Sequence, residues 1–253
     1  MKIIILIFLI KTLQAQIADF ESVNYNFNRS ITKNPSLISG LDKFIINTSY
    51  YNLYGIGIDN FSISAGLNIK NILNFGITYK NIDYSKALNH NYEENIFIFS
   101  FGRSFKFLQP GINLKLKDIK PSVDFGIILN FKKFNLAFSV INFYSKIDEY
   151  YLSENKIFAG LFLNIFEYIK LNFEIENLKK NILATLAPKI FISENIYFQV
   201  GLKNNFDFLF DININVKSFN CQVSYNNVNN LGNTIILNLS FLFSKNILTG
   251  YIF

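Results

Sequence analysis

Apolar and polar side chains alternate along most of this 253-residue chain, and three segments show the alternation most clearly. In residues 169–177, 208–217 and 219–226, apolar residues occupy every second position, and Lys, Glu, Asp, Asn, Gln or Ser occupies most positions between them. Successive side chains of a β-strand point to opposite faces, so each segment predicts a strand with one apolar and one polar face. Lys217-Ser218 separates the last two segments and predicts a tight hairpin turn.

Weaker alternation predicts further strands, which brings the total to about 14. They cover residues 44–52, 61–69, 73–81, 96–105, 111–117, 123–131, 134–143, 157–165, 182–192, 196–203 and 234–243. The breaks between them contain Asn, Asp, Lys, Gly and Ser, which are typical turn residues. After the first 15 residues, no stretch approaches the roughly 18 uninterrupted apolar residues of a membrane-spanning helix.

Strands can cross a membrane only when they close into a barrel, because lipid offers no partner to free backbone N–H and C=O groups. A soluble β-sandwich also has one apolar face per strand and is the alternative. Several predicted strands have nine or more residues, whereas strands of globular proteins usually have about 5–6. We therefore predict an all-β fold, a transmembrane antiparallel β-barrel of about 14 strands. Aromatic residues near strand ends, expected at the membrane–water interfaces, include Tyr50, Tyr84, Phe143 and Tyr168.

The first residues predict a cleaved signal peptide. Lys2 precedes an apolar run, Ile3 to Ile10, which is too short to span a bilayer as a helix, and Ala15 is the small residue at the expected cleavage site. An uncleaved anchor is the alternative. Residues 1–15 are then the signal peptide, residues 16–41 are a mature N-terminal segment that serves as a periplasmic lead-in or plug, and residues 42–253 are the outer-membrane barrel.

Composition narrows the classes of function. The 24 Lys and Arg residues exceed the 18 Asp and Glu residues modestly and are scattered along the chain, which does not favour binding of nucleic acid. The single cysteine, Cys221, excludes an internal disulfide framework, and the single histidine, His90, cannot supply a histidine-based metal cluster. Neither a nucleophile motif nor a zinc pattern surrounds His90. We therefore expect no enzymatic activity, no cofactor and no bound metal.

Polar positions on the clearest strands are candidates for the inner wall of the barrel. They are Lys170, Glu174, Glu176, Asp211, Asn213, Lys217 and Gln222. About 14 strands enclose more space than an 8-stranded barrel, which its own side chains fill, and less than an open porin of 16–18 strands. A polar interior of this size suits water and small hydrophilic solutes, and it is either open or blocked.

A family resemblance begins close behind the predicted leader. Residues 20–28, then Lys33-Asn34-Pro35-Ser36 and Gly40, resemble the mature start of the PorP/SprF family of outer-membrane barrels of Bacteroidota. That family opens with an aromatic and Asn-containing stretch, followed by an Asn-Pro-Ala-type motif and a glycine. Residues 57–60, 121–126 and 134–140 also look like the family pattern. Leu231-Gly232-Asn233-Thr234 resembles a motif of the related PorV/PorQ barrels, which are similar to FadL-type transporters.

This resemblance implies an accessory or anchoring component of a type IX secretion or gliding system. Such a barrel would lie in outer-membrane lipid and bind protein partners of that machinery, and Asn34, Pro35 and Gly40 would be its family-motif residues. The alternative is a FadL-like or porin-like channel for small solutes. Residues 16–41 are the candidate contact or plug element, and an ordered lead-in to the first strand remains equally open.

Overall fold

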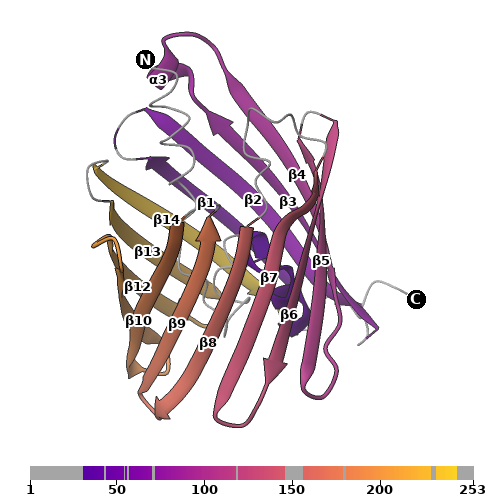
Figure 1. The fold of residues 1–253 in the computed structure, drawn as a ribbon, viewed down its shortest axis with the longest axis vertical. Coiled ribbons are helices and arrows are strands. Elements are labelled where there is room, and N and C mark those ends of the chain that lie inside the picture. The colour runs from indigo at the N-terminus through magenta and orange to yellow at the C-terminus, as the bar shows by residue number, and fades with distance from the viewer. Residues whose placement is uncertain are drawn as a thin grey trace.

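Fourteen antiparallel strands close into one barrel in the computed structural model (Figure 1). The structure describes residues 31–42, 44–53, 55, 57–69, 72–117, 119–145, 156–178, 181–228 and 232–243. The predicted signal peptide, residues 16–30 of the predicted N-terminal segment and residues 244–253 lie outside this part of the chain. The predicted fold class, an all-β antiparallel barrel of about 14 strands, is confirmed.

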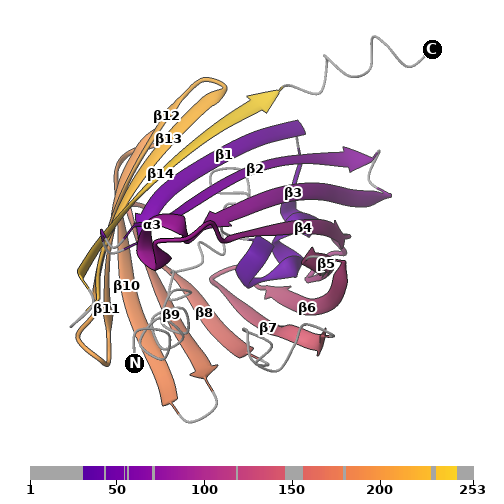
Figure 2. The same ribbon diagram turned by 90° about the horizontal axis from the view of Figure 1, so that it is seen from above.

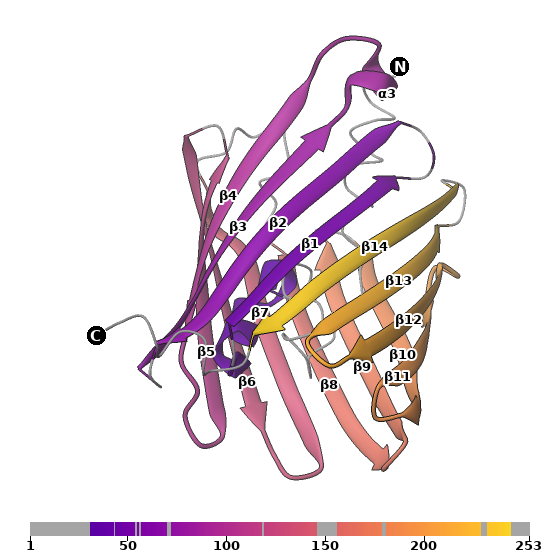
Figure 3. The same cartoon turned by 180° about the vertical axis from the view of Figure 1, so that it is seen from behind.

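The strands follow one another around the barrel in chain order. They are β1 (Phe44–Leu53), β2 (Ile58–Ile69), β3 (Leu73–Asp83), β4 (Glu93–Gly102), β5 (Leu108–Lys117), β6 (Lys120–Asn130), β7 (Phe134–Ser145), β8 (Lys156–Phe166), β9 (Ile169–Leu178), β10 (Asn181–Ser193), β11 (Ile196–Lys203), β12 (Phe208–Val216), β13 (Phe219–Val228) and β14 (Gly232–Phe243). β1 pairs with β14 from Phe44 opposite Phe243 to Asn52 opposite Ile235, and this pairing closes the ring (Figure 3). Closure leaves no strand edge among the fourteen without a partner.

Each predicted strand matches one observed strand, and the differences lie at the ends. β2, β4, β5 and β6 each begin three residues earlier than the alternation predicts. β4 also ends at Gly102, although the pattern predicts a strand up to residue 105. Residues 103–107 instead form a tight connection in which the Phe105 N–H donates to the Leu108 carbonyl at 2.8 Å. The predicted hairpin turn at Lys217-Ser218 is confirmed.

The barrel has an apolar outside and a polar inside. On β12, for example, Asp211 and Asn213 are buried, whereas the neighbouring Ile212 and Ile214 are 39% and 43% exposed. Large apolar side chains are exposed on the outer face of other strands as well, and they include Phe61, Ile63, Phe97, Leu114, Phe125, Phe138, Phe173, Val223 and Leu237. A soluble protein buries its apolar side chains. This inverse polarity excludes the β-sandwich alternative and is what a barrel surrounded by lipid requires.

The two ends of the barrel differ. One end, the turn end, carries two-residue turns such as Glu167-Tyr168, Glu194-Asn195 and Lys217-Ser218. The other, the loop end, carries the connection of residues 84–92, which contains the short helix α3 (Ser85–Leu88) and projects beyond the other strands (Figure 1). With an even number of strands, β1 begins and β14 ends at the turn end.

Tyr84 does not lie at a membrane interface as predicted. Only 1% of its surface is exposed, because it packs against Tyr92 with ring centroids 5.4 Å apart, and its hydroxyl lies 3.5 Å from Glu94. Desolvation, with Glu94 nearby, raises the pKa of the Tyr84 hydroxyl far above its usual value, so it stays protonated. Tyr50, Phe143 and Tyr168, by contrast, are exposed. None of the helical segments among the described residues is long and apolar enough to reach across a bilayer.

Candidate functional site in the barrel interior

Residues 31–41, here called the inner segment, lie inside the barrel against the wall formed by β3 to β7. Figure 2 shows this indigo stretch within the ring of strands, beside β4, β5 and β6. Its main element is the 3-10 helix η1 (Pro35–Gly40), whose residues 35–39 are all buried. Ile31, Leu37, Ile38 and Leu41 form an apolar cluster with wall residues of β1, β6 and β7, namely Ile45, Ile128 and Ala137. Part of the wall that the inner segment covers is therefore apolar.

Wall side chains bind the inner segment through its backbone carbonyl groups. Asn113 donates to the Ile31 carbonyl at 2.8 Å, and the Ser139 hydroxyl donates to the Lys33 carbonyl at 2.8 Å. Asn74 donates to two carbonyls, those of Ile38 and Ser39, at 2.8 Å each. In addition, Asn68 donates to the Leu41 carbonyl at 3.0 Å. These bonds give otherwise buried carbonyl groups a partner, as buried backbone requires.

Three glycines on adjacent strands let the inner segment approach the wall closely. Gly102, Gly111 and Gly126 lie directly opposite one another on β4, β5 and β6, and we call them the glycine row. Asn74 on β3 continues this row on one side and Ser139 on β7 on the other. The inner segment runs along the row, with its residue 33 at Ser139 and its residues 38 and 39 at Asn74.

Side chains on the glycine row would collide with the inner segment. A Cβ atom at Gly111 would overlap the Pro35 carbonyl and lie 2.5 Å from the Ser36 Cα, and both are backbone atoms. A Cβ at Gly126 would overlap Asn34, and one at Gly102 would lie 2.5 Å from the Ile38 side chain. Glycine inside a strand commonly marks a place where another backbone approaches closely, and the glycine row is such a place.

Asn34 and Pro35 start η1. Asn34 is the N-cap, and its side-chain oxygen accepts from the Ser36 N–H at 3.0 Å and from the Ser36 hydroxyl at 2.6 Å. Pro35 occupies the first helical turn, where its missing N–H is not needed. Gly40 is exposed, and a Cβ there would meet nothing closer than 4.0 Å. The first two residues of the predicted family motif thus shape the inner segment, and the third imposes no steric requirement.

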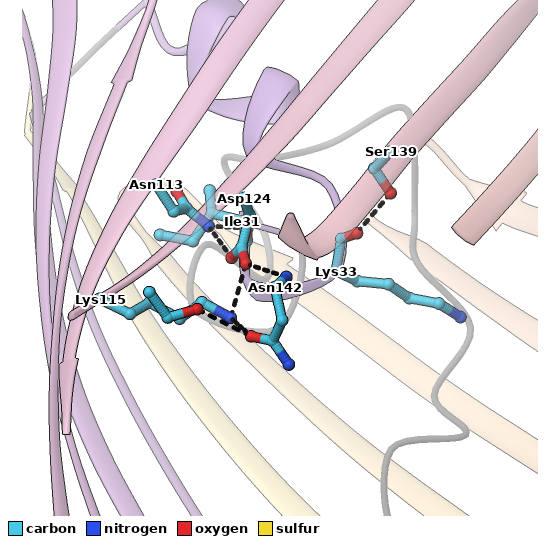
Figure 4. Close-up of polar contacts among 8 residues, drawn as sticks. Ile31, Lys33, Asn113, Lys115, Asp124, Ser139 and Asn142 are labelled. Atoms are coloured by element: carbon cyan, nitrogen blue, oxygen red, sulfur yellow. Dashed lines mark hydrogen bonds and ion pairs between the residues drawn. The ribbon is translucent and has the colours of Figure 1, made fainter. Parts of the chain in front are cut away.

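A polar network in the wall supports the start of the inner segment (Figure 4). Asp124 on β6 lies 2.7 Å from the Lys115 ammonium, accepts from the Asn142 N–H at 2.8 Å and contacts Asn113 at 3.3 Å. Asn142 has a φ of +58° near an irregularity in the pairing of β6 with β7, and this conformation turns its N–H toward Asp124. Asn113 links the network to the inner segment through the Ile31 carbonyl.

Lys33 extends from the inner segment toward a different part of the wall. Its carbonyl is held by Ser139, while its side chain projects away from the network of Asp124 (Figure 4). The Lys33 ammonium forms an ion pair and a hydrogen bond with Glu174 of β9 and lies 5.0 Å from the centre of the Phe158 ring of β8. Both charged side chains are at least 93% buried. The inner segment is thereby attached to strands on both sides of β7.

The predicted inner-wall residues fall into two groups. Glu174, Glu176, Asp211, Asn213 and Gln222 are buried on inward-facing positions of β9, β12 and β13. Lys170 also faces inward but is only half-buried, with its ammonium 4.9 Å from the centre of the Phe191 ring. Lys217 does not lie on the inner wall: it is exposed in the turn between β12 and β13 with a φ of +54°. The alternation of β12 ends one residue earlier than the sequence pattern indicates.

The single histidine lies in a connection and the single cysteine on a strand. His90 lies in a bend after α3, and its Nδ1 is 3.1 Å from the Leu88 carbonyl. Cys221 lies on β13 as a free thiol, opposite Ile214 on β12, whose side chain faces outward. Among the described residues, no group of three His, Cys, Asp or Glu side chains is arranged to hold a metal ion.

Sequence reasoning missed the glycine row and its flanking residues, as well as the role of Lys33. A signal for the row was present, because Gly102, Gly111 and Gly126 replace a side chain at inward-facing positions of otherwise alternating strands. Isolated glycines in a strand pattern indicate a bulge or a close backbone approach. The pairing of Lys33 with Glu174 had no such signal, since 141 residues separate the two in sequence.

Comparison with known proteins supports the fold. No family model and no curated protein matches this chain. Among solved structures, the outer membrane protein Omp33 of Acinetobacter baumannii is similar with a TM-score of 0.58 and 11% identity, over 79% of this chain and 98% of that one. KdgM porin is similar with a TM-score of 0.48 and 9% identity, over 79% of this chain and 99% of that one. A triple mutant of Rhodopseudomonas blastica porin has a TM-score of 0.46 and 7% identity over the same shares.

The closed ring of fourteen antiparallel strands and its inverse polarity define the class of this protein. It is an integral β-barrel of the bacterial outer membrane with a porin-like fold. At 11% identity the likeness extends to the architecture alone.

Proposed function

We propose that this protein is a non-enzymatic channel for small hydrophilic solutes and that the inner segment narrows its interior. The observation that carries the proposal is the inward-facing side of the described strands, which is predominantly polar and includes charged side chains of both signs, such as Lys189, Asp211 and Glu174. An apolar outer face does not by itself require polar side chains on the inner face. Inward-facing polar side chains are expected where the interior accommodates water or polar groups. Fourteen strands also provide more space than their own side chains require.

Reconstitution of the full-length protein tests this function. In planar bilayers with KCl on both sides, we expect discrete conductance steps, and in liposomes we expect entry of small sugars with an upper size limit. A matched pair of cysteine variants on β9, in a Cys221→Ser background, locates the path. Lys170→Cys faces the interior, whereas Phe173→Cys faces outward with 37% of its surface exposed.

A charged, water-soluble methanethiosulfonate reagent should change the conductance of Lys170→Cys and leave that of Phe173→Cys unaltered. Heat-modified mobility in gel electrophoresis controls for folding of both variants. Folded protein that passes neither ions nor sugars would refute the channel. An equal response of the two cysteine variants would show that current does not pass through the barrel interior.

A second candidate is an accessory or anchoring component of a type IX secretion or gliding system, as in the PorP/SprF family. One observation favours it: Asn34 and Pro35, the residues that carry the resemblance, also shape the inner segment, so the motif has a definite structural purpose in this chain. A barrel of this kind would bind protein partners, and residues 16–41 are the candidate contact.

Cross-linking in native membranes of the host, followed by affinity purification, tests this candidate. We expect components of the secretion or gliding machinery to be recovered with the full-length protein and to be lost when residues 16–39 are removed. Gly40→Ala serves as the control, because a Cβ there has space. Unchanged recovery of all partners with the shortened chain would contradict a contact through residues 16–41.

A further inference from the structure

The ion pair between Lys33 and Glu174 joins the inner segment to the strands on the far side of β7. The Lys33 backbone is fixed at the end of the glycine row, where Ser139 binds its carbonyl. From there the side chain passes the Phe158 ring and reaches Glu174. A cation inside the barrel is therefore supplied by the inner segment and not by a strand.

Other charged side chains lie near this pair, toward the loop end. Glu176 is two residues beyond Glu174 on the same face of β9, and Lys156 of β8 lies 4.0 Å from it. Lys203 of β11 lies 3.9 Å from Asp207. Without Lys33, this group carries three negative and two positive charges when ionised: Glu174, Glu176 and Asp207 against Lys156 and Lys203. Lys33 brings the group to three of each sign.

Removal of either member of the pair would leave its partner without its principal counter-charge in a mostly enclosed site. The electrostatic potential in this part of the interior would then become more negative without Lys33 and more positive without Glu174. A cleft with charge of one sign raises the local concentration of ions of the opposite sign. The electrostatic potential that Lys33 and Glu174 set together therefore acts on any ion that passes them.

We propose that Lys33 and Glu174 determine the ion selectivity of this barrel, with Lys33 placed in the interior by the docking of the inner segment on the glycine row. The inference rests on the proposed channel function. In this proposal Lys33, a residue outside the fourteen strands, contributes a positive charge that controls which ions pass through the conduction path.

Reversal potentials in a KCl gradient test the proposal, using full-length protein in planar bilayers at pH 8, well above the usual pKa of a glutamate. Lys33→Met should raise the ratio of K⁺ to Cl⁻ permeability, and Glu174→Gln should lower it, each by about two- to fivefold for one unit charge near the path. The double variant should return close to the wild-type ratio. Lys217→Met, an exposed turn position at the barrel end, is the control and should leave the ratio unchanged.

Two further measurements make the outcome unambiguous. Barrel folding of every variant is checked by heat-modified gel mobility. In a Cys221→Ser background, Lys33→Cys and Glu174→Cys together should be joined by a bis-maleimide of about 10 Å, while Lys33→Cys with Lys217→Cys should not. The Lys33 and Glu174 side chains meet at their ends, so the two backbones are separated by the length of both side chains. A linker of about 10 Å suits that separation once both residues are cysteine, because each extended side chain reaches several ångströms from its backbone.

The possible failures are distinct. If the wild-type protein conducts but both single variants keep its permeability ratio, the selectivity proposal is overturned and the channel remains. If both single variants shift the ratio in the same direction, the assignment of opposite charges to the path is overturned. If folded wild-type protein carries no current, the proposed function itself is refuted and this inference with it. Absence of the Lys33–Glu174 cross-link in conducting protein would also overturn the proposal.

Discussion

Replacing Gly111 by alanine is the most direct test of how the inner segment is held. Gly111 is the middle member of the glycine row, and its missing side chain leaves room for the backbone of Pro35 and Ser36. A methyl group there would meet backbone atoms, which cannot rotate away as the end of a flexible side chain can. The inner segment must therefore move away from β5, while β5 itself keeps its pairing with β4 and β6.

The magnitude follows from the contacts. Overpacking by a single group in a filled interior costs about 1–3 kcal/mol. Docking of the inner segment would weaken by this amount, so the undocked fraction would rise about 5- to 150-fold. The hydrogen bonds from Asn74 and Ser139 to the inner segment would also lengthen, since they lie at the two ends of the same row. Each such bond contributes roughly 0.5–1.5 kcal/mol.

Chemical labelling measures the undocked fraction. Ser36 is fully buried, so in a Cys221→Ser, Ser36→Cys background a water-soluble maleimide reacts only when the inner segment leaves the wall. We expect Gly111→Ala to raise the labelling rate by the factor above. Gly40→Ala, the matched control within the inner segment, should leave the rate within about twofold, because surface substitutions rarely change stability by more than about 0.5 kcal/mol. Equal rates in the two alanine variants would refute the steric role of the glycine row.

Three further predictions concern the inner segment, the loop end and the outer face. Asn34→Ala removes the cap of η1 and should weaken docking by about 1 kcal/mol, seen as about fivefold faster Ser36→Cys labelling; an unchanged rate would argue against the cap. Lys117→Met leaves Glu94 buried without its counter-charge and should lower the free energy of unfolding in urea by about 3–5 kcal/mol. The double variant Lys117→Met with Glu94→Gln should recover part of this loss, and a double variant no more stable than Lys117→Met would contradict the uncompensated charge as the cause. Phe173→Arg should cost about 2–4 kcal/mol in lipid if β9 faces the bilayer core there, whereas Phe173→Leu should cost much less.

The sequence by itself determined the fold class and the faces of the strands. Alternation is a local property with a period of two, so 169–177 and 208–217 could be recognised as strands without knowledge of their neighbours. Polar positions such as Glu174, Asp211 and Asn213 were assigned to the interior for the same reason. The same locality explains the error at Lys217, where the alternating pattern continues for one residue into the turn.

Only the tertiary structure decided what occupies the interior. Gly102, Gly111 and Gly126 form a row because the pairing register of three strands brings them opposite one another, and the register of a hairpin is set by its turn type and loop length, which alternation does not specify. Lys33 meets Glu174 across 141 positions of sequence because the inner segment docks on that row. Side-chain alternation specifies which way each residue points, but it does not specify which distant residue lies opposite.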